Sequence, residues 1–194
     1  MSKKTFKGSA MLNPVPAVLV TSKNKNNEIN VFTVGWIGTV STKPPIISLG
    51  IRPERLSYEY IKQTGEFVVN LPKKDMVKIV DYCGVVSGKK EDKIKKFKFD
   101  LIPSQNINVP IINDCPISLE CKVRDIIPLG SHSLFLADVL SIHVDDELID
   151  SKGKIHFEKA NLISYCHGEY YSLPQKSIGK FGFSVTKKQR KRKK

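Results

Sequence analysis

The 194-residue chain lacks most of the motifs by which common enzyme classes are recognised. No G-x-G-x-x-G follows a predicted strand, which argues against a doubly wound dinucleotide-binding domain. HExxH and G-x-S-x-G are also absent, so zinc peptidases and serine hydrolases have no support. Residues 84–90, GVVSGKK, resemble a phosphate loop, but the spacing is one residue short and no Ser or Thr follows the lysine. The sequence therefore does not predict typical hydrolase chemistry.

Cysteine and long apolar runs are also scarce. The four cysteines are far apart, without a CxxC pair or zinc-ligand spacing, so they predict free thiols and no metal site. No apolar run approaches the ~20 residues that a membrane-spanning helix needs. The N-terminus has no signal-peptide pattern, so we expect a cytoplasmic protein that does not enter a membrane.

Acidic residues are outnumbered by basic ones, 19 to 32, which gives a net charge of +13. Seven of the positive charges lie in residues 187–194, KKQRKRKK, and without them the net charge falls to +6. A block of like charges repels itself and is usually a disordered tail. At this length the rest of the chain predicts one domain, residues 1–186.

Most of the chain reads as short strands with Gly and Pro turns between them. A strand at 17–21, a polar turn and a strand from Ile29 predict a hairpin, and 66–71 predicts a further strand. From Cys115 onward, apolar and polar residues alternate, which predicts a half-buried strand with a long partner after the 128–130 turn. We expect helices near 57–63, ended by Gly65, and near 76–83, ended by Gly84. The predicted class is mainly β, a closed or partly closed barrel with a few short helices.

One stretch, residues 29–57, could hold a phosphorylated aromatic ligand. Two glycines flank Trp36 and would let a flat ring approach the backbone. A helix beginning near Ser57 offers free N–H groups, and Arg52 and Arg55 lie beside it in the sequence. The residues also allow plainer interpretations, in which Ser57 is only a helix N-cap, the arginines are surface charges, and Trp36 is part of the core.

For three later residues, the residue chemistry alone does not decide between a role in a binding site and an ordinary structural role. Lys93 lies in a charged run of the type that usually faces solvent. His132 follows a turn, where an exposed histidine is the ordinary expectation. Tyr165 could cap the core.

Taken in order, several sequence pieces resemble the flavin reductase-like family of FMN-binding split β-barrels, and its flavoredoxin branch most of all. They are PVPAVLVTS, NVFTVGWIGTVSTKPP with RPERLSYE, TGEFVVNLP, CGVVSGKKEDKIKKF and PLGSHSLFLADV. The resemblance extends over residues 11–168 and implies a homodimer of split barrels that holds FMN near the dimer interface.

The resemblance also implies positions for the cofactor. It places the flavin ring and ribityl chain along Asn30, Thr33 and Trp36. It assigns the phosphate end to Arg52, Ser57 and Lys93. His132 would approach the ring or the reductant, and Tyr165 would occupy a position where the family tends to place an aromatic residue. A positive charge from Lys93 or a protonated His132 would favour the anionic reduced flavin.

The function implied is electron transfer through bound FMN, as an NAD(P)H:flavin oxidoreductase or an electron-transfer flavoprotein. The donor would be NAD(P)H or a redox protein, and the acceptor free flavin or a protein partner. No catalytic side chain is predicted, because the flavin itself carries the redox chemistry. The alternative is a non-enzymatic β-barrel that binds nucleic acid through the basic tail and stacking on Trp36.

Overall fold

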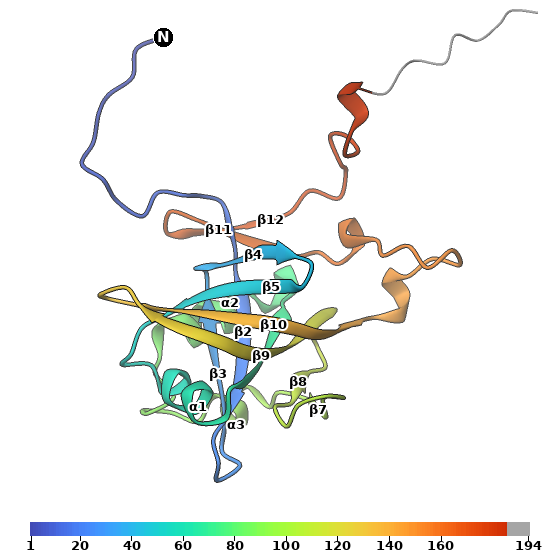
Figure 1. The fold of residues 1–194 in the computed structure, drawn as a ribbon. Coiled ribbons are helices and arrows are strands. Elements are labelled where there is room, and N and C mark those ends of the chain that lie inside the picture. The colour runs from blue at the N-terminus through green and yellow to red at the C-terminus, as the bar shows by residue number, and fades with distance from the viewer. Residues whose placement is uncertain (186–194) are drawn as a thin grey trace, which may run out of the picture.

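The computed structural model describes residues 1–185, and strands make up most of its regular structure (Figure 1). The strands are β1 (Val15–Pro16), β2 (Val18–Lys23), β3 (Ile29–Val34), β4 (Ile37–Thr42), β5 (Pro45–Ile51), β6 (Glu66–Leu71), β7 (Leu101–Ile102), β8 (Ile111–Ile112), β9 (Ile117–Pro128), β10 (Ser133–Val144), β11 (Ile163–Cys166) and β12 (Glu169–Ser172). The α-helices are α1 (Leu56–Thr64), α2 (Val77–Val85) and α3 (Lys93–Phe97). Short 3₁₀ turns are η1 (Lys74–Met76), η2 (Asp146–Leu148), η3 (Phe157–Lys159) and η4 (Phe183–Val185).

Seven antiparallel strands form the main sheet in the order β3-β2-β6-β9-β10-β5-β4. The sheet curls around one apolar core that takes side chains from β2, β3, β5, β6, β9 and β10, together with Ile61 of α1. Its edge strands, β3 and β4, are not paired with each other, although only two residues, Gly35 and Trp36, connect them. The result is a barrel left open along one seam, which confirms the predicted class.

Strand β2 is buried on both faces, which explains its nearly unbroken apolar sequence. Val18 and Val20 point into the barrel core, whereas Leu19 belongs to a second cluster with Val31 of β3 and Val80 of α2. Helix α2 therefore packs on the outside of β2 and β3, where it forms one wall of the pocket described below.

Several predicted elements are confirmed, among them the β2–β3 hairpin and the strand at 66–71. Helix α1 ends as predicted at Gly65, which has φ 71° and whose N–H donates to the Ile61 carbonyl. The prediction that Gly84 ends the second helix is wrong, because α2 continues through it to Val85. Gly84 serves close packing instead: a Cβ there would lie 3.4 Å from Cβ of Thr33.

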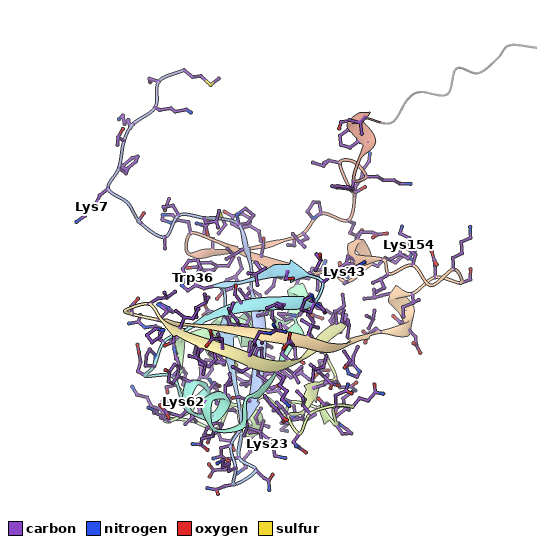
Figure 2. All side chains as sticks on the ribbon, in the orientation of Figure 1. Lys7, Lys23, Trp36, Lys43, Lys62 and Lys154 are labelled. Carbon is purple, nitrogen blue, oxygen red and sulfur yellow. The ribbon has the colours of Figure 1, made fainter. Side chains whose placement is uncertain are left out.

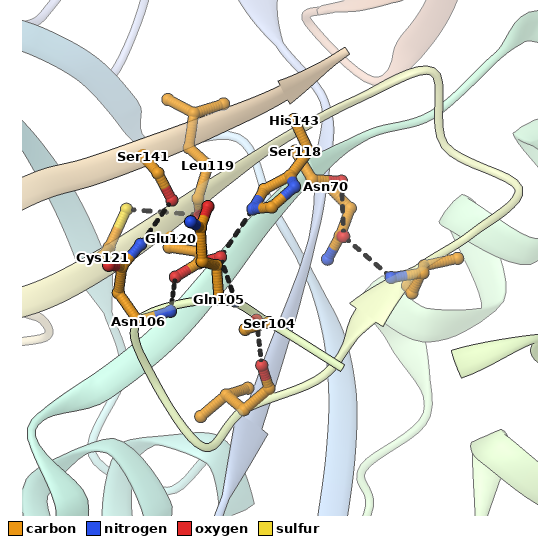
Figure 3. A network of polar contacts seen from close by, with 12 residues as sticks. Asn70, Ser104, Gln105, Asn106, Ser118, Leu119, Glu120, Cys121, Ser141 and His143 are labelled. Atoms are coloured by element: carbon orange, nitrogen blue, oxygen red, sulfur yellow. Dashed lines mark hydrogen bonds and ion pairs between the residues drawn. The ribbon is translucent and has the colours of Figure 1, made fainter. Parts of the chain in front are cut away.

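Strand β9 departs from the predicted half-buried pattern. Ser118 and Glu120, expected on the solvent side, are 1% and 0% exposed. The segment before β8 covers them: the backbone N–H groups of Gln105 and Asn106 each donate to Glu120 at 2.7 Å, and His143 of β10 contacts the same carboxylate (Figure 3). Period-two alternation could not reveal this covering segment, because it comes from elsewhere in the chain.

The small sheet β1-β11-β12 lies beside the barrel, and the chain leaves it at both ends in extended segments (Figure 1). Among residues 1–185 no helix is long and apolar enough to cross a membrane. The predicted basic tail, residues 187–194, lies outside the described residues.

Candidate functional site

A pocket of about 410 Å³ gathers five of the eight predicted site residues. This volume lies within the range of ~300–1,000 Å³ that is typical of small-molecule sites. The five predicted residues on its wall are Thr33, Trp36, Arg52, His132 and Tyr165. The rest of the wall consists of Ala17, Phe32, Val34, Gly35, Gly50, Ile51, Arg55, Asp81, Gly84, Val85, Gly168 and Tyr170.

Trp36 lies at the seam between β3 and β4, with 38% of its surface exposed (Figure 2). Its carbonyl accepts a 2.8 Å hydrogen bond from the N–H of Gly50, which ties the seam to β5. A Cβ at Gly50 would lie 3.2 Å from Cβ of Trp36, so the glycine permits this close approach. Because the indole lies on the pocket wall and is partly exposed, the interpretation of Trp36 as a core residue is wrong.

Thr33 is fixed by its own hydrogen bond. Its hydroxyl donates to the carbonyl of Val80 on α2, so this side chain joins β3 to the helix that forms the adjoining wall. Thr33 also packs against Gly84, where a Cβ would lie 3.4 Å from Cβ of Thr33. The hydrogen bond therefore fixes how β3 and α2 meet at the pocket wall.

Positive charge is concentrated where β5 leads into α1. Arg52 and Arg55 both line the pocket, and Arg55 is the N-cap residue of α1. The Arg52 Nε atom lies 2.6 Å from Glu54, an exposed pair that leaves the rest of the guanidinium free to bind. Arg55 was noted in the sequence but was not included in the predicted set; its spacing of three residues from Arg52 was the available signal.

His132 lines the pocket near this charge. Burial lowers the pKa of its imidazole, the positive charge of Arg52 lowers it further, and Glu54 opposes the change. Since the ordinary value is about 6.5, the ring is mainly neutral at pH 7. The lowered pKa disfavours the protonated form of His132, and the cations on the pocket wall are Arg52 and Arg55.

The other three predicted residues, Asn30, Ser57 and Lys93, are absent from the pocket wall and almost fully buried. The Ser57 hydroxyl oxygen accepts hydrogen bonds from the Asn30 amide and from the Ser22 hydroxyl, both at 2.8 Å. The N-cap interpretation of Ser57 is wrong, because Arg55 occupies that position. Gly88 packs directly on this cluster: a Cβ there would lie 2.2 Å from Oδ1 of Asn30.

Lys93 is 1% exposed, so the interpretation of this residue as a solvated charge is also wrong. Its Nζ atom donates to the carbonyls of Cys83 and Val86, at 3.5 and 3.0 Å, around the end of α2. Burial lowers the pKa of Lys93; the Cys83 side chain opposes this, and the positive charge of Arg55 adds to it. Lys93 therefore lies close enough to Arg55 to contribute to the positive field at this end of the pocket.

The β11–β12 hairpin closes the remaining side. Tyr165 and Tyr170 pair across it with ring centroids 5.6 Å apart, and the Tyr170 hydroxyl donates to Asp81 of α2 at 3.2 Å. Burial and the nearby Asp81 carboxylate raise the pKa of Tyr170 to about 12, so this phenol stays protonated. Asp81 and Tyr170 were missed, since nothing in the sequence pairs residues so far apart.

The barrel and pocket define the class of protein. Residues 11–174 match the family model described as flavin reductase like domain, and the chain belongs to that family. An uncharacterized protein of Archaeoglobus fulgidus is 34% identical over 129 residues, covering 66% of this chain and 73% of that protein.

Solved structures agree with this assignment. The flavoredoxin of Methanosarcina acetivorans is 26% identical, with a TM-score of 0.85 over 96% of this chain and 100% of that one. The flavoredoxin of Desulfovibrio vulgaris (Miyazaki F) is 23% identical, with a TM-score of 0.89 over 95% and 100% of the two chains. The fold and the predicted family, the flavin reductase-like split barrels, are thus confirmed.

Proposed function

We propose that this protein binds FMN in the pocket between β3, α2 and the β11–β12 hairpin and transfers electrons through it. The observation that carries the proposal is the division of the pocket wall. Trp36 and Tyr165 supply aromatic surface, whereas Arg52 and Arg55 supply positive charge where β5 leads into α1. A flat ring joined to a phosphate has the same division into an apolar and an anionic part.

The residues present fit such a group. Arg52 and Arg55 would hold the phosphate, because a guanidinium pairs with phosphate oxygens through two parallel hydrogen bonds. The wall includes Gly35, which leaves backbone accessible to a ring. Neutral His132 could donate or accept a hydrogen bond there.

Asn30, Ser57 and Lys93 would act from behind the wall. The Asn30–Ser57 hydrogen bond ties β3 to the first turn of α1, and therefore fixes the helix whose N-cap residue is Arg55. Lys93 keeps the end of α2 in place and adds positive charge. When bound, the flavin supplies the redox chemistry, accepting a hydride or single electrons.

The partners proposed are NAD(P)H or a redox protein as donor, and free flavin or a protein as acceptor. The phenol of Tyr170, which stays protonated, and the Asp81 carboxylate lie on the wall that such a partner would approach. Mixing the flavin-loaded protein with NADH, NADPH and small redox proteins, and following flavin reduction, would identify the donor. Reduction by none of them would overturn the electron-transfer part of the proposal.

We also propose a homodimer formed through the uncovered side of the sheet. Among residues 1–185, no helix lies in front of β4, β5, β10 and β9 in the view of Figure 1. These strands expose apolar side chains: Val40 of β4 is 57% exposed, and Leu140 and Ile142 of β10 are 44% and 58% exposed. Apolar surface of this kind marks interaction sites.

The phosphate assignment can be tested by comparing FMN with riboflavin, which lacks the phosphate. Replacing Arg55→Gln should weaken FMN binding by about 1.5–3 kcal/mol, the range for a hydrogen bond to a charged group, and leave riboflavin binding nearly unchanged. Lys62→Gln is the matched control, because Lys62 is an exposed cation on the same helix and does not line the pocket. An equal loss for both ligands would show that Arg55 does not bind the phosphate.

The alternative function, a β-barrel that binds nucleic acid, has little support. The family match covers residues 11–174, and more than half of the excess positive charge lies beyond it, in residues 187–194.

A further inference from the structure

The chain leaves β12 as an arm, residues 173–185, that carries uncovered apolar side chains. It is anchored at its start, where the N–H of Leu173 donates to the carbonyl of Leu162 at 3.0 Å. Beyond that point Ile178 is 104% exposed, Phe181 111%, Phe183 66% and Val185 83%. In Figure 1 the arm extends away from the barrel. Proteins rarely leave several large apolar side chains together in water, so this arm points to an interaction.

A groove of about 620 Å³ lies at the far end of β10, between that strand and the segment 145–155. Its apolar wall includes Ile142, Ile149 and Ile155, of which Ile142 is 58% and Ile149 40% exposed. Figure 2 places Lys154, at the tip of this segment, on the opposite side of the molecule from Trp36. The groove is therefore separate from the flavin pocket.

The arm and the groove carry opposite charge. The arm contains Lys176 and Lys180 and no acidic residue, and the basic residues 187–194 follow it in the sequence. At the groove, Asp145 lines the wall, and the segment 145–155 is acidic overall, with four carboxylates (Asp145, Asp146, Glu147 and Asp150) against two lysines (Lys152 and Lys154). Burial raises the pKa of Asp145; Lys73 opposes this, while Glu147 and Asp146 raise it further, so an added cation would stabilise the ionised carboxylate.

We propose that this groove receives the arm of a second copy of the chain, so that two copies exchange arms across the dimer. The inference rests on the homodimer of the proposed function, and it adds a binding site and its occupant. The flavin pocket would not suit the arm, because Arg52 and Arg55 would repel its lysines. Ile142 lies both on β10, a strand of the proposed dimer surface, and in the groove, so the groove borders the partner copy.

The arm is 13 residues long. Extended chain spans about 3.3 Å per residue, so residues 173–185 cover roughly 40 Å. The same length would let the arm fold back onto its own groove. In the structure the arm leaves that groove uncovered, and the experiment must separate the two arrangements.

Analytical ultracentrifugation of the full-length protein tests the contribution of the arm. The double variant Phe181→Ser/Phe183→Ser should raise the dimer dissociation constant at least about tenfold, since a buried Phe side chain contributes more than one factor of ten. Phe6→Ser is the matched control, because Phe6 is 83% exposed on the N-terminal segment, and it should change nothing. A dimer with an unchanged constant would overturn the arm exchange and leave the dimer intact. A full-length protein that is monomeric throughout would overturn the homodimer itself.

Cross-linking tests the occupant. A photoreactive phenylalanine at position 181 would be introduced into isotopically heavy and light protein, and the two would be mixed before illumination. Arm exchange predicts cross-links from 181 to the segment 142–155 in pairs that join a heavy and a light chain. Cross-links confined to one isotope would show that the arm folds onto its own groove, and cross-links to other surfaces would also overturn the proposal.

Discussion

The buried carboxylate of Glu120 offers a sharp test of the packing described here. Glu120 is 0% exposed, and its two oxygens accept the backbone N–H groups of Gln105 and Asn106, while His143 contacts Oε1 (Figure 3). These contacts hold the segment that begins at Ser104 against β9. Glu120→Gln keeps the shape of the side chain, but leaves one oxygen where there were two.

The size of the effect follows from those donors. One backbone N–H would face an NH₂ group instead of an oxygen, and an unsatisfied buried donor costs about 1–3 kcal/mol. The remaining hydrogen bonds lose their charge, which weakens each by a further fraction of the ~1.5–3 kcal/mol of a charged bond. We therefore expect the free energy of unfolding at pH 7 to fall by about 2–4 kcal/mol, a large share of the 5–15 kcal/mol typical of a domain.

The effect should depend on pH. Burial raises the pKa of Glu120, but the N–H donors of Gln105 and Asn106 and the contact with His143 outweigh it, so that its pKa is lowered overall. A carboxylate with a lowered pKa stabilises the fold fully above the pKa of the unfolded chain, near 4.3, and loses that contribution as the pH falls through the folded value. The difference between wild type and Glu120→Gln should therefore shrink in this acidic range.

Urea unfolding measured across that pH range would check this prediction. Glu66→Gln is the control: Glu66 accepts the N–H of Asn108 from the same segment at 2.9 Å, but this hydrogen bond is exposed and should contribute little. A loss below 1 kcal/mol for Glu120→Gln, or a loss equal to that of the control, would refute the account of the network.

The remaining predictions concern the flavin pocket. Trp36→Ala should weaken FMN binding by ~1–3 kcal/mol, the range for stacking on an aromatic side chain, whereas an unchanged dissociation constant would remove Trp36 from the site. Gly88→Ala should displace Asn30 and weaken FMN retention, while Gly38→Ala, where a Cβ meets nothing within 4 Å, should not; equal retention in the two variants would contradict the role of the buried cluster. Deleting residues 187–194 should leave the flavin content intact, and loss of flavin would show that the tail takes part in binding.

The sequence predicted the parts of the fold that local patterns determine. Alternating and continuous apolar runs placed β6 and the β2–β3 hairpin, and Gly65 marked the end of α1 because its left-handed backbone favours glycine. Gly84 was misread because a glycine can also serve close packing, and this depends on a neighbour, Thr33, that is distant in the sequence.

Only some of the predicted site residues lie on the pocket wall, because their positions also depend on contacts between distant parts of the chain. Family resemblance identified Trp36 and Tyr165, which lie on the wall, but it could not separate wall residues from those behind it. Lys93 has the sequence surroundings of a solvated charge, and only the packing of α2 and α3 buries it. Tyr170 and Asp81 meet across the pocket from positions 89 apart, a pairing that one sequence cannot reveal.

The most direct test of the central claim is a flavin titration of the purified full-length protein. The account predicts that the protein either carries FMN that is released on denaturation, or binds added FMN saturably at one site per chain with a perturbed flavin spectrum. A protein that contains no flavin and leaves the spectrum and fluorescence of added FMN unchanged would contradict it.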